Sequence, residues 1–219
     1  MAKPSQAIED YLKHIYLIDE TGEKVTGQAL AHRLKVAAPS VTAMLRRLGE
    51  MQLIEYEPYK GALLTDQGRK IALEVIRHHR LIESYLAEVL GMPWDEVHDE
   101  AEVLEHHISE RMEALMAEKL GHPEFDPHGH PIPSVDLKIP QRTIRPLASL
   151  IAGERATVKS IRNEHREMLR YLHELGITPD RDITVQQRAP LDGPMTILND
   201  VGQQHAIGMQ IAECIDVSA

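Results

Sequence analysis

Cysteine is almost absent from this sequence, since Cys214 is the single one among 219 residues. One thiol excludes an intramolecular disulfide framework and a thiolate-rich zinc site, and it is typical of a cytoplasmic protein. The sequence also lacks any apolar run near the roughly 18 residues that span a bilayer. Its first residues, Met-Ala-Lys-Pro-Ser-Gln, contain no apolar signal core. We therefore expect a cytoplasmic chain with no membrane partner.

Basic residues are too few to balance the acidic ones, and the formal net charge is −10. This charge is unevenly distributed: residues 1–70 hold ten Lys or Arg and nine Asp or Glu, whereas residues 83–124 hold twelve acids and two bases. The first segment is therefore close to neutral and can face nucleic acid. The middle segment either attracts cations or forms an acidic, solvated helix face.

The first 65 residues have the pattern of a winged helix-turn-helix. Apolar residues at helical spacing predict helices over 5–20, 27–34 and 40–51, with a tight turn between the last two. The β-prone runs 53–57 and 62–64 flank Pro-Tyr-Lys-Gly and predict a hairpin. Two short helices followed by a hairpin are typical of a DNA-binding head with a wing.

The exposed face of the predicted helix 40–51 is suited to a DNA groove. It carries short side chains first, which allow close approach to base edges, and arginines one turn later, which can reach phosphate or guanine. The candidate DNA-binding residues are Pro39, Ser40, Thr42, Ala43, Arg46 and Arg47, with Lys60 at the wing. The alternative is a winged helix that binds another protein instead of DNA.

Beyond residue 65 the pattern changes twice. Helices are predicted from about 65 to 90, near 94–107 and near 109–120, and six of the thirteen prolines then lie between His122 and Pro146. Short β-prone runs follow at 156–161, 182–187, 195–198 and 205–207, with a helix over 164–175, and they predict a small β-barrel. The expected domains are therefore 1–65, 66–125, a Pro-rich linker over 126–150, and 151–219.

Six acidic and histidine side chains have metal-ligand spacing on the two helices before the linker. They stand at i, i+3 or i+4 on helix faces that would converge on packing: His79, Glu83, His98, Glu102, Glu105 and His106. Carboxylates gathered in this way repel one another unless a divalent cation binds them. Oxygen and nitrogen donors without thiolate favour an octahedral ion such as Mn²⁺ or Fe²⁺ over tetrahedral structural zinc.

A single Glu–His pair at helical spacing is more often a solvated surface pair, so the metal prediction depends on several pairs occurring together. Five other histidines lie off this stripe and are interpreted as surface or linker residues: His78, His107, His122, His128 and His130.

Three segments of the sequence resemble the DtxR/MntR family of metal-dependent repressors: Ala-Ile-Glu-Asp-Tyr-Leu-Lys-His-Ile-Tyr from Ala7, Pro-Ser-Val-Thr from Pro39, and Val-His-Asp-Glu-Ala-Glu-Val-Leu-Glu-His-His from Val97. The segment Leu169–Ile177 is similar to part of an SH3-like, FeoA-type domain. The resemblance implies a mainly α protein with a small β part: an N-terminal winged helix-turn-helix, a helical dimerisation domain and a C-terminal SH3-like β-barrel. It also implies a homodimer on double-stranded operator DNA.

The resemblance further implies about two metal ions per subunit. One site would use Asp10, Glu102, Glu105 and His106, and a second would use His79, Glu83 and His98. Glu164 or Glu167 would complete the second site, with His165 as an alternative. Acids at positions 10 and 102 resemble the manganese sensors of the family, so Mn²⁺ is expected first and Fe²⁺ second.

Lys13 departs from the pattern of manganese sensors that lack a C-terminal domain, which have a carboxylate there. A protonated lysine cannot bind a metal, which favours two separate sites over a two-metal cluster.

The expected function is that of a metal-dependent transcriptional regulator, a repressor of metal-uptake genes, with no enzymatic activity. Metal would join Asp10 on the head to ligands on the dimer domain and so fix the two heads about one DNA turn apart, roughly 34 Å or a multiple. One alternative is a carboxylate-bridged di-metal oxidase, which needs Glu-x-x-His pairs on two helices, and this sequence has none. The other is a winged-helix regulator that senses an organic ligand.

Overall fold

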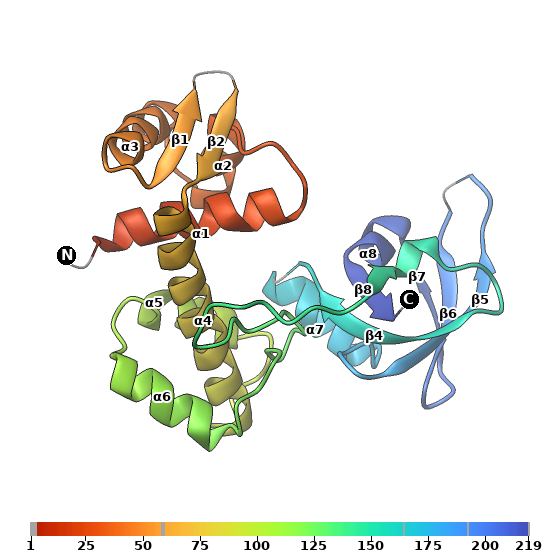
Figure 1. Ribbon diagram of the computed structural model, residues 1–219. Helices are drawn as coiled ribbons and strands as arrows, with labels where there is room; N and C mark the ends of the chain where they lie inside the picture. Colours follow the sequence, from red (N-terminus) through yellow and green to blue (C-terminus); the bar gives the residue numbers. More distant parts are fainter. Residues whose placement is uncertain (1–3, 58–59, 164, 192, 219) are drawn as a thin grey trace. The chain divides into compact units, whose positions relative to one another are not determined.

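The computed structural model describes residues 4–57, 60–163, 165–191 and 193–218. They belong to two compact units, whose helices and strands are labelled in Figure 1. The first unit comprises Met1–His78, Glu105–Ile108 and Pro133–Lys138, and the second comprises His79–Leu104, Ser109–Ile132 and Ile139–Ala219.

Up to Leu64, the described residues of the first unit form three helices and a hairpin: α1 (Gln6–Glu20), α2 (Gly27–Leu34), α3 (Ala38–Glu50), β1 (Ile54–Glu57) and β2 (Gly61–Leu64). Its core consists of apolar residues that repeat at helical spacing and are almost fully buried, among them Leu12, Ile15, Leu30, Val41, Leu45 and Leu48. This arrangement confirms the predicted winged helix-turn-helix.

Local signals set the turn between α2 and α3. The Thr26 hydroxyl accepts a hydrogen bond from the Ala29 amide at 3.1 Å and so caps the start of α2. Lys35 ends this helix in the left-handed region at φ 54°. Pro39 occupies the first turn of α3, where its missing N–H costs nothing.

The wing is a regular antiparallel hairpin in which Ile54 pairs with Leu64 and Glu57 pairs with Gly61. Its predicted tip includes Pro58 and Tyr59, which lie outside the described residues. The Thr65 amide donates to the Leu53 carbonyl at 3.1 Å and joins the hairpin to the next helix.

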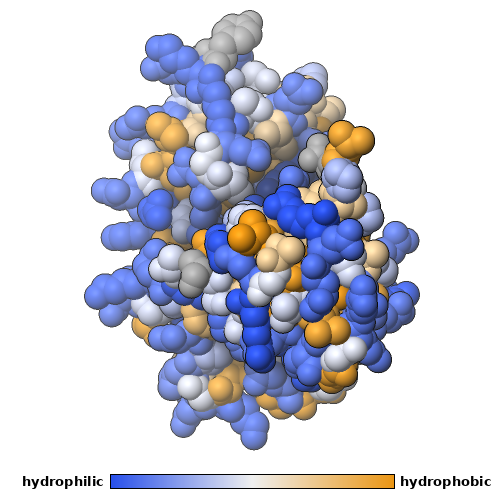
Figure 2. Space-filling view, turned by 90° about the vertical axis from the view of Figure 1, so that its right-hand side faces the viewer, coloured by the Kyte–Doolittle hydropathy of each residue, from blue (hydrophilic) through white to orange (hydrophobic). Residues whose placement is uncertain are grey.

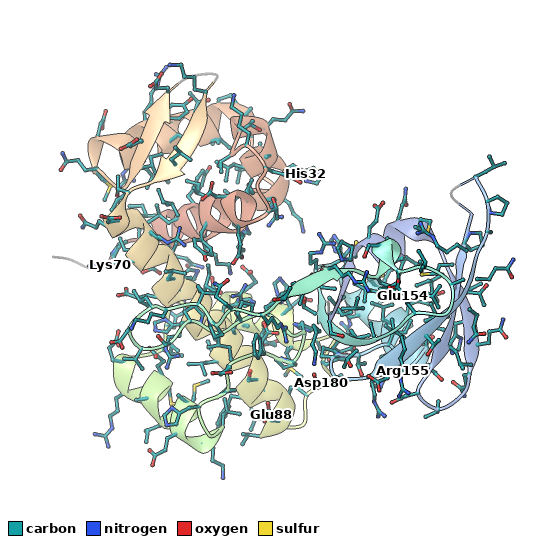
Figure 3. The ribbon with its side chains drawn as sticks, turned by 45° about the vertical axis from the view of Figure 1, so that its right-hand side comes forward. His32, Lys70, Glu88, Glu154, Arg155 and Asp180 are labelled. Carbon is teal, nitrogen blue, oxygen red and sulfur yellow. The ribbon has the colours of Figure 1, made fainter. Side chains whose placement is uncertain are left out.

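Three helices follow the wing: α4 (Asp66–Glu88), α5 (Val97–Leu104) and α6 (Glu110–Lys119). In Figure 3, the labelled residues Lys70 and Glu88 mark the stretch of α4 that contains His79 and Glu83. The ends of α4 and α6 lie close to those predicted. The prediction for α5 was wrong in extent, because residues 94–96 form turns after Pro93 and the helix stops at Leu104.

Residues 122–143 contain no helix and no strand beyond an isolated bridge between Phe125 and Pro131. The segment is nevertheless partly buried, since Asp126 is 5%, His128 0% and Ile132 2% exposed. Two arginines of α4 hold its backbone: Arg77 donates to the Pro133 carbonyl at 2.6 Å, and Arg80 donates to the Pro131 carbonyl at 2.5 Å.

The described residues between Ile144 and Ser218 form a six-stranded antiparallel sheet in the order β3-β8-β4-β5-β6-β7. Its elements are β3 (Ile144–Pro146), the 3-10 helix η1 (Leu147–Ser149), β4 (Arg155–Ile161), α7 (Arg166–Glu174), β5 (Asp182–Arg188), β6 (Met195–Asn199), β7 (Gln204–Ile207), α8 (Met209–Glu213) and β8 (Ile215–Ser218). Figure 3 labels Glu154 and Arg155 at the start of β4 and Asp180 before β5.

This sheet confirms the predicted SH3-like domain. Register shifts in β4 between Val158 and Ser160, and in β5 between Val185 and Gln187, bend the sheet around an apolar core. The core residues Val158, Val185, Ile197 and Val217 have no exposed surface. The sequence patterns did not predict β3, α8 or β8, although β8 lies between β3 and β4 in the sheet.

The face in Figure 2 is mostly hydrophilic, with separate hydrophobic groups among the polar ones. Among the helices of the described residues, none combines the length and the apolar character that crossing a membrane requires.

Candidate metal centre

The first cluster of candidate ligands is formed by α1 and by the segment that follows α5. Helix α1 positions Asp10, and the chain after Leu104 positions Glu105 and His106. His106 Nε2 lies 2.8 Å from Asp10 Oδ1 and 3.3 Å from Glu105 Oε1. One ligand atom from each residue therefore lies within 4.8 Å of the other two, a spacing that suits a single ion.

The electrostatics of this cluster favour a cation. Burial by itself lowers the pKa of His106, but hydrogen bonds to Asp10 and Glu9 and the charge of Glu105 outweigh it and raise this pKa. A divalent ion would bind to the same negative charge that raises this pKa.

Two residues that the sequence did not predict as ligands contact this cluster. Glu9 Oε2 lies 2.6 Å from His106 Nδ1, and Lys13 Nζ donates to both carboxylate oxygens of Glu105 at 2.7 and 2.8 Å. Glu9 is 4% exposed and Lys13 is 3% exposed. Their spacing places residues 9 and 13 near Asp10 on one face of α1, but it does not specify their partners, which lie 97 and 92 residues away.

The second cluster lies on α4 and α5. His79 Nε2 is 3.0 Å from Glu83 Oε1 and 3.1 Å from His98 Nδ1, and His98 Nδ1 is 3.2 Å from the same Glu83 oxygen. The i, i+4 spacing of His79 and Glu83 places both on one face of α4, as the sequence predicted. The structure thus brings His79, Glu83 and His98 together.

Glu83 is fully buried, and its two oxygens differ in environment. Burial raises its pKa, but the charge of His79, the nearby imidazole of His128 and hydrogen bonds from His79 and His98 together hold this pKa well below its usual range. Its second oxygen, Oε2, is buried and accepts no hydrogen bond from the described residues. A buried carboxylate oxygen without a donor is costly, and a metal ion would remove that cost.

His128 lies in the predicted Pro-rich linker, but it is not a surface residue. It was interpreted as a surface or linker histidine, yet its side chain is fully buried and its Nδ1 lies 3.7 Å from Glu83 Oε1. Its Nε2 hydrogen-bonds the Trp94 carbonyl at 2.8 Å, which leaves Nδ1 directed to the carboxylate. His78 is buried as well, and one of its ring nitrogens lies 3.1 Å from the Glu105 carbonyl oxygen.

The loop that carries His128 is fixed to β4. The Ile161 amide donates to the His128 carbonyl at 2.9 Å, and Arg142 donates to the carbonyls of Gly129 and Lys159. Gly129 has φ +87°, and a Cβ added there would lie 1.9 Å from the Lys159 carbonyl oxygen. Only glycine allows this approach without a shift of the backbone.

The remaining predicted ligands that the structure describes do not lie where the sequence assigned them or are exposed. Glu102 Oε1 lies 3.9 Å from His79 Nδ1 and 3.7 Å from His98 Nε2, at the second cluster. His165 and Glu167 are exposed at the start of α7, and Glu164 lies outside the described residues. Their assignments stay predictions.

The predicted DNA-binding face of α3 is open to solvent. Ser40, Ala43, Arg46 and Arg47 are exposed and Thr42 is half-buried. Lys60 is exposed too, but its Nζ lies 2.6 Å from Glu57 Oε2 on the same hairpin.

Both clusters fit a divalent metal by the chemistry of their donors. Each combines carboxylate oxygen with imidazole nitrogen, and neither contains a thiolate. This donor set suits Mn²⁺, Fe²⁺, Zn²⁺ or Co²⁺ and gives no advantage to soft ions.

Three models of known protein families match the chain in succession. Residues 4–62 match the N-terminal DNA-binding domain of iron-dependent repressors, residues 65–134 match their metal-binding and dimerisation domain, and residues 145–219 match the FeoA domain.

Known relatives extend along most of the chain. The iron-dependent repressor IdeR of Mycobacterium leprae is 30% identical over 190 residues, which cover 81% of this chain and 83% of that protein. A solved manganese-dependent transcriptional repressor in complex with manganese is 39% identical, with a TM-score of 0.91 over 97% of this chain and 99% of that one. The structure of ScaR with bound Cd²⁺ is 30% identical, with a TM-score of 0.82 over 98% and 99%.

Proposed function

Because the chain belongs to the iron-dependent repressor family, whose members are metal-dependent, DNA-binding transcriptional regulators and not enzymes, we propose that Mn²⁺ is its activating ion. Fe²⁺ is the second choice. Asp10 and Glu105 are hard oxygen donors, and neither cluster offers the sulfur that softer ions prefer. The relatives themselves are named for iron or manganese, and one was solved with cadmium, so the choice of Mn²⁺ rests on the acids at positions 10 and 102, which resemble those of the manganese sensors.

The first site in this proposal uses Asp10, Glu105 and His106; the sequence also predicts Glu102 as a ligand there, but its carboxylate lies beside His79 and His98 of the second cluster. The observation that carries it is the convergence of Asp10 Oδ1 and Glu105 Oε1 on His106 Nε2. Asp10 belongs to α1 of the DNA-binding head, whereas Glu105 and His106 follow α5, so an ion bound there joins the two segments. Metal would thereby hold the head in the conformation that binds operator DNA.

The second site in this proposal uses His79, Glu83 and His98. His128 is a candidate to complete it, since its imidazole nitrogen lies beside the buried carboxylate of Glu83. Glu164 and Glu167 stay alternatives from the sequence. With one ion at each cluster, a subunit would bind about two ions.

The operator interface is assigned to the exposed face of α3 with Arg46 and Arg47, and the dimer interface to α5 and α6. Several large apolar side chains on α5 and α6 are exposed: Val103, Leu104, Met112 and Leu115. Such a group of apolar residues is suited to a second copy of the chain. We retain the domain limits 1–65, 66–125, 126–150 and 151–219, the repression of metal-uptake genes and a cytoplasmic location as parts of the proposal.

A matched pair of adjacent histidines tests the first site. His106 is buried in the cluster, whereas His107 is exposed. An operator duplex is first selected from random sequences with wild-type protein and Mn²⁺. His106→Ala should then lose Mn²⁺-dependent binding of this duplex while remaining a folded dimer, and His107→Ala should bind as the wild type does. Operator binding by His106→Ala at wild-type Mn²⁺ concentrations would refute the site.

The same preparation separates the alternative functions. A regulator that senses an organic ligand would bind the duplex equally well after chelation and after addition of Mn²⁺. A di-metal oxidase would consume O₂ with bound Fe²⁺, and the family comparisons give that alternative no support.

A further inference from the structure

Two buried side chains of opposite charge flank the first cluster from α1. Glu9 contacts His106 through Nδ1, the nitrogen that faces away from Asp10, and Lys13 contacts both oxygens of Glu105. Charged groups are costly to bury unless their partners are fixed. Here each charge is fixed to a residue that the proposed function names as a ligand.

We propose that Glu9 and Lys13 set the metal affinity of the first cluster in opposite directions, Glu9 raising it and Lys13 lowering it. The inference rests on the proposed function and adds two positioning residues that are not ligands themselves.

Glu9 acts through the imidazole of His106. An ionised carboxylate only accepts hydrogen bonds, so at 2.6 Å the Nδ1 of His106 must carry the hydrogen. A metal ion then meets the lone pair of Nε2, the nitrogen beside Asp10 and Glu105. A carboxylate behind a histidine ligand fixes the orientation of the ring and makes its nitrogen more basic, and losing such a partner typically weakens metal binding about 10- to 100-fold.

Lys13 acts through its positive charge and through its hydrogen bonds to both oxygens of Glu105. Its ammonium lies 2.7 Å from Glu105 Oε1, the oxygen that faces His106 Nε2, so an ion in the cluster would sit close to a like charge. Like charges at short range in a buried site repel strongly. The ammonium also binds Glu105 Oε2, and the metal must therefore share the carboxylate with Lys13.

The test uses the full chain with His98→Ala as the parent, which removes a ligand of the second cluster. Free Mn²⁺ is measured by electron paramagnetic resonance during titration. Glu9→Gln should weaken Mn²⁺ binding about tenfold or more, and Lys13→Met should strengthen it about tenfold. Asp19→Asn on the exposed end of α1 and Lys70→Met on α4 are matched controls of the same charge changes and should bind as the parent does.

Opposite changes in the Mn²⁺ affinity of Glu9→Gln and Lys13→Met distinguish this effect from a structural role. A loss of packing would weaken Mn²⁺ binding in both variants. Shifts in the same direction, or parent-like binding in both, would overturn the inference. A parent that binds no Mn²⁺ in stoichiometric amount would instead refute the proposed function.

Loss of Lys13 leaves Glu105 buried without its cation, so the folding of Lys13→Met must be followed as well. Lys13→Gln removes the same charge while keeping a hydrogen-bond donor for Glu105. The rise in unfolding temperature on addition of Mn²⁺ measures affinity even for a weakened apo form, and it should exceed that of the parent in both Lys13 variants. A smaller rise in both would contradict the assignment of Lys13.

Discussion

Replacing Gly129 by alanine should detach the loop of His128 from β4. The new Cβ would lie 1.9 Å from the carbonyl oxygen and 2.8 Å from the carbonyl carbon of Lys159, which are backbone atoms that cannot rotate away. The loop must therefore move. That movement would break the hydrogen bond from the Ile161 amide to the His128 carbonyl and weaken the contact of Arg142 with the Gly129 carbonyl.

The size of the expected loss in the free energy of unfolding follows from a comparison with Gly153. Gly153 has φ +91° against +87° for Gly129, and a Cβ added at Gly153 has no atom within 4 Å. The free energy of unfolding of both alanine variants should fall by about 1–2 kcal/mol, because L-residues disfavour positive φ. Only Gly129→Ala also loses one neutral hydrogen bond, about 1 kcal/mol, and one from a charged donor, about 2 kcal/mol. The difference between the two variants should be about 3 kcal/mol.

Two measurements check this prediction. Denaturant unfolding gives the free energy of unfolding of both variants. Fluorescence of Trp94, the single tryptophan, reports the second cluster, because its ring lies 5.4 Å from that of His128. Gly129→Ala should weaken Mn²⁺ binding detected in this way, and Gly153→Ala should not. Equal losses of stability in the two variants would refute the reasoning, since they would mean that the docked loop contributes nothing.

Arg46→Ala and Arg47→Ala should each weaken operator binding and reduce its dependence on log salt concentration by about one unit per lost phosphate contact; unchanged slopes in gel-shift titrations would place these side chains away from DNA. Because the pKa of His106 is raised and a metal binds only neutral imidazole, apparent Mn²⁺ affinity should rise with pH through and above the ordinary histidine value of about 6.5, by up to about tenfold per unit. A flat profile between pH 6 and 8 in a chain carrying His98→Ala would show that no proton leaves on binding. The double variant Asp10→Met/Glu102→Cys should need more Mn²⁺ for the same operator occupancy, with Fe²⁺ affected less; anaerobic titrations that leave the Mn²⁺/Fe²⁺ ratio unchanged would remove Asp10 and Glu102 as the basis of metal selectivity.

The winged helix-turn-helix could be predicted from the sequence because its signals are local. Thr26 as a cap, Pro39 in a first turn and the apolar spacing of α3 each specify structure within a few residues. The same is true of His79 and Glu83, whose i, i+4 spacing on α4 places both side chains on one helix face. Strand β8 was not predicted, and its partners in the sheet, β3 and β4, lie far from it in the sequence.

The contacts of Glu9, Lys13 and His128 could not be predicted in this way. Lys13 and Glu105 are 92 residues apart, and Glu9 and His106 are 97 apart. The burial of His128 depends on an aperiodic loop whose carbonyl groups are held by Ile161 and Arg142. In each case the partner is a consequence of tertiary packing, which no local rule specifies.

The position of β8 in the sheet has a consequence for the order of synthesis. Residues 215–218 form hydrogen bonds with β3 on one side and β4 on the other, although β3 leaves the ribosome long before them. At about 5–20 residues per second, the earlier strands wait several seconds for the strand that joins them. The loop of His128 docks on β4, so its final position should also be reached only late in translation. A nascent chain would then acquire its DNA-binding head first and the complete second metal cluster last.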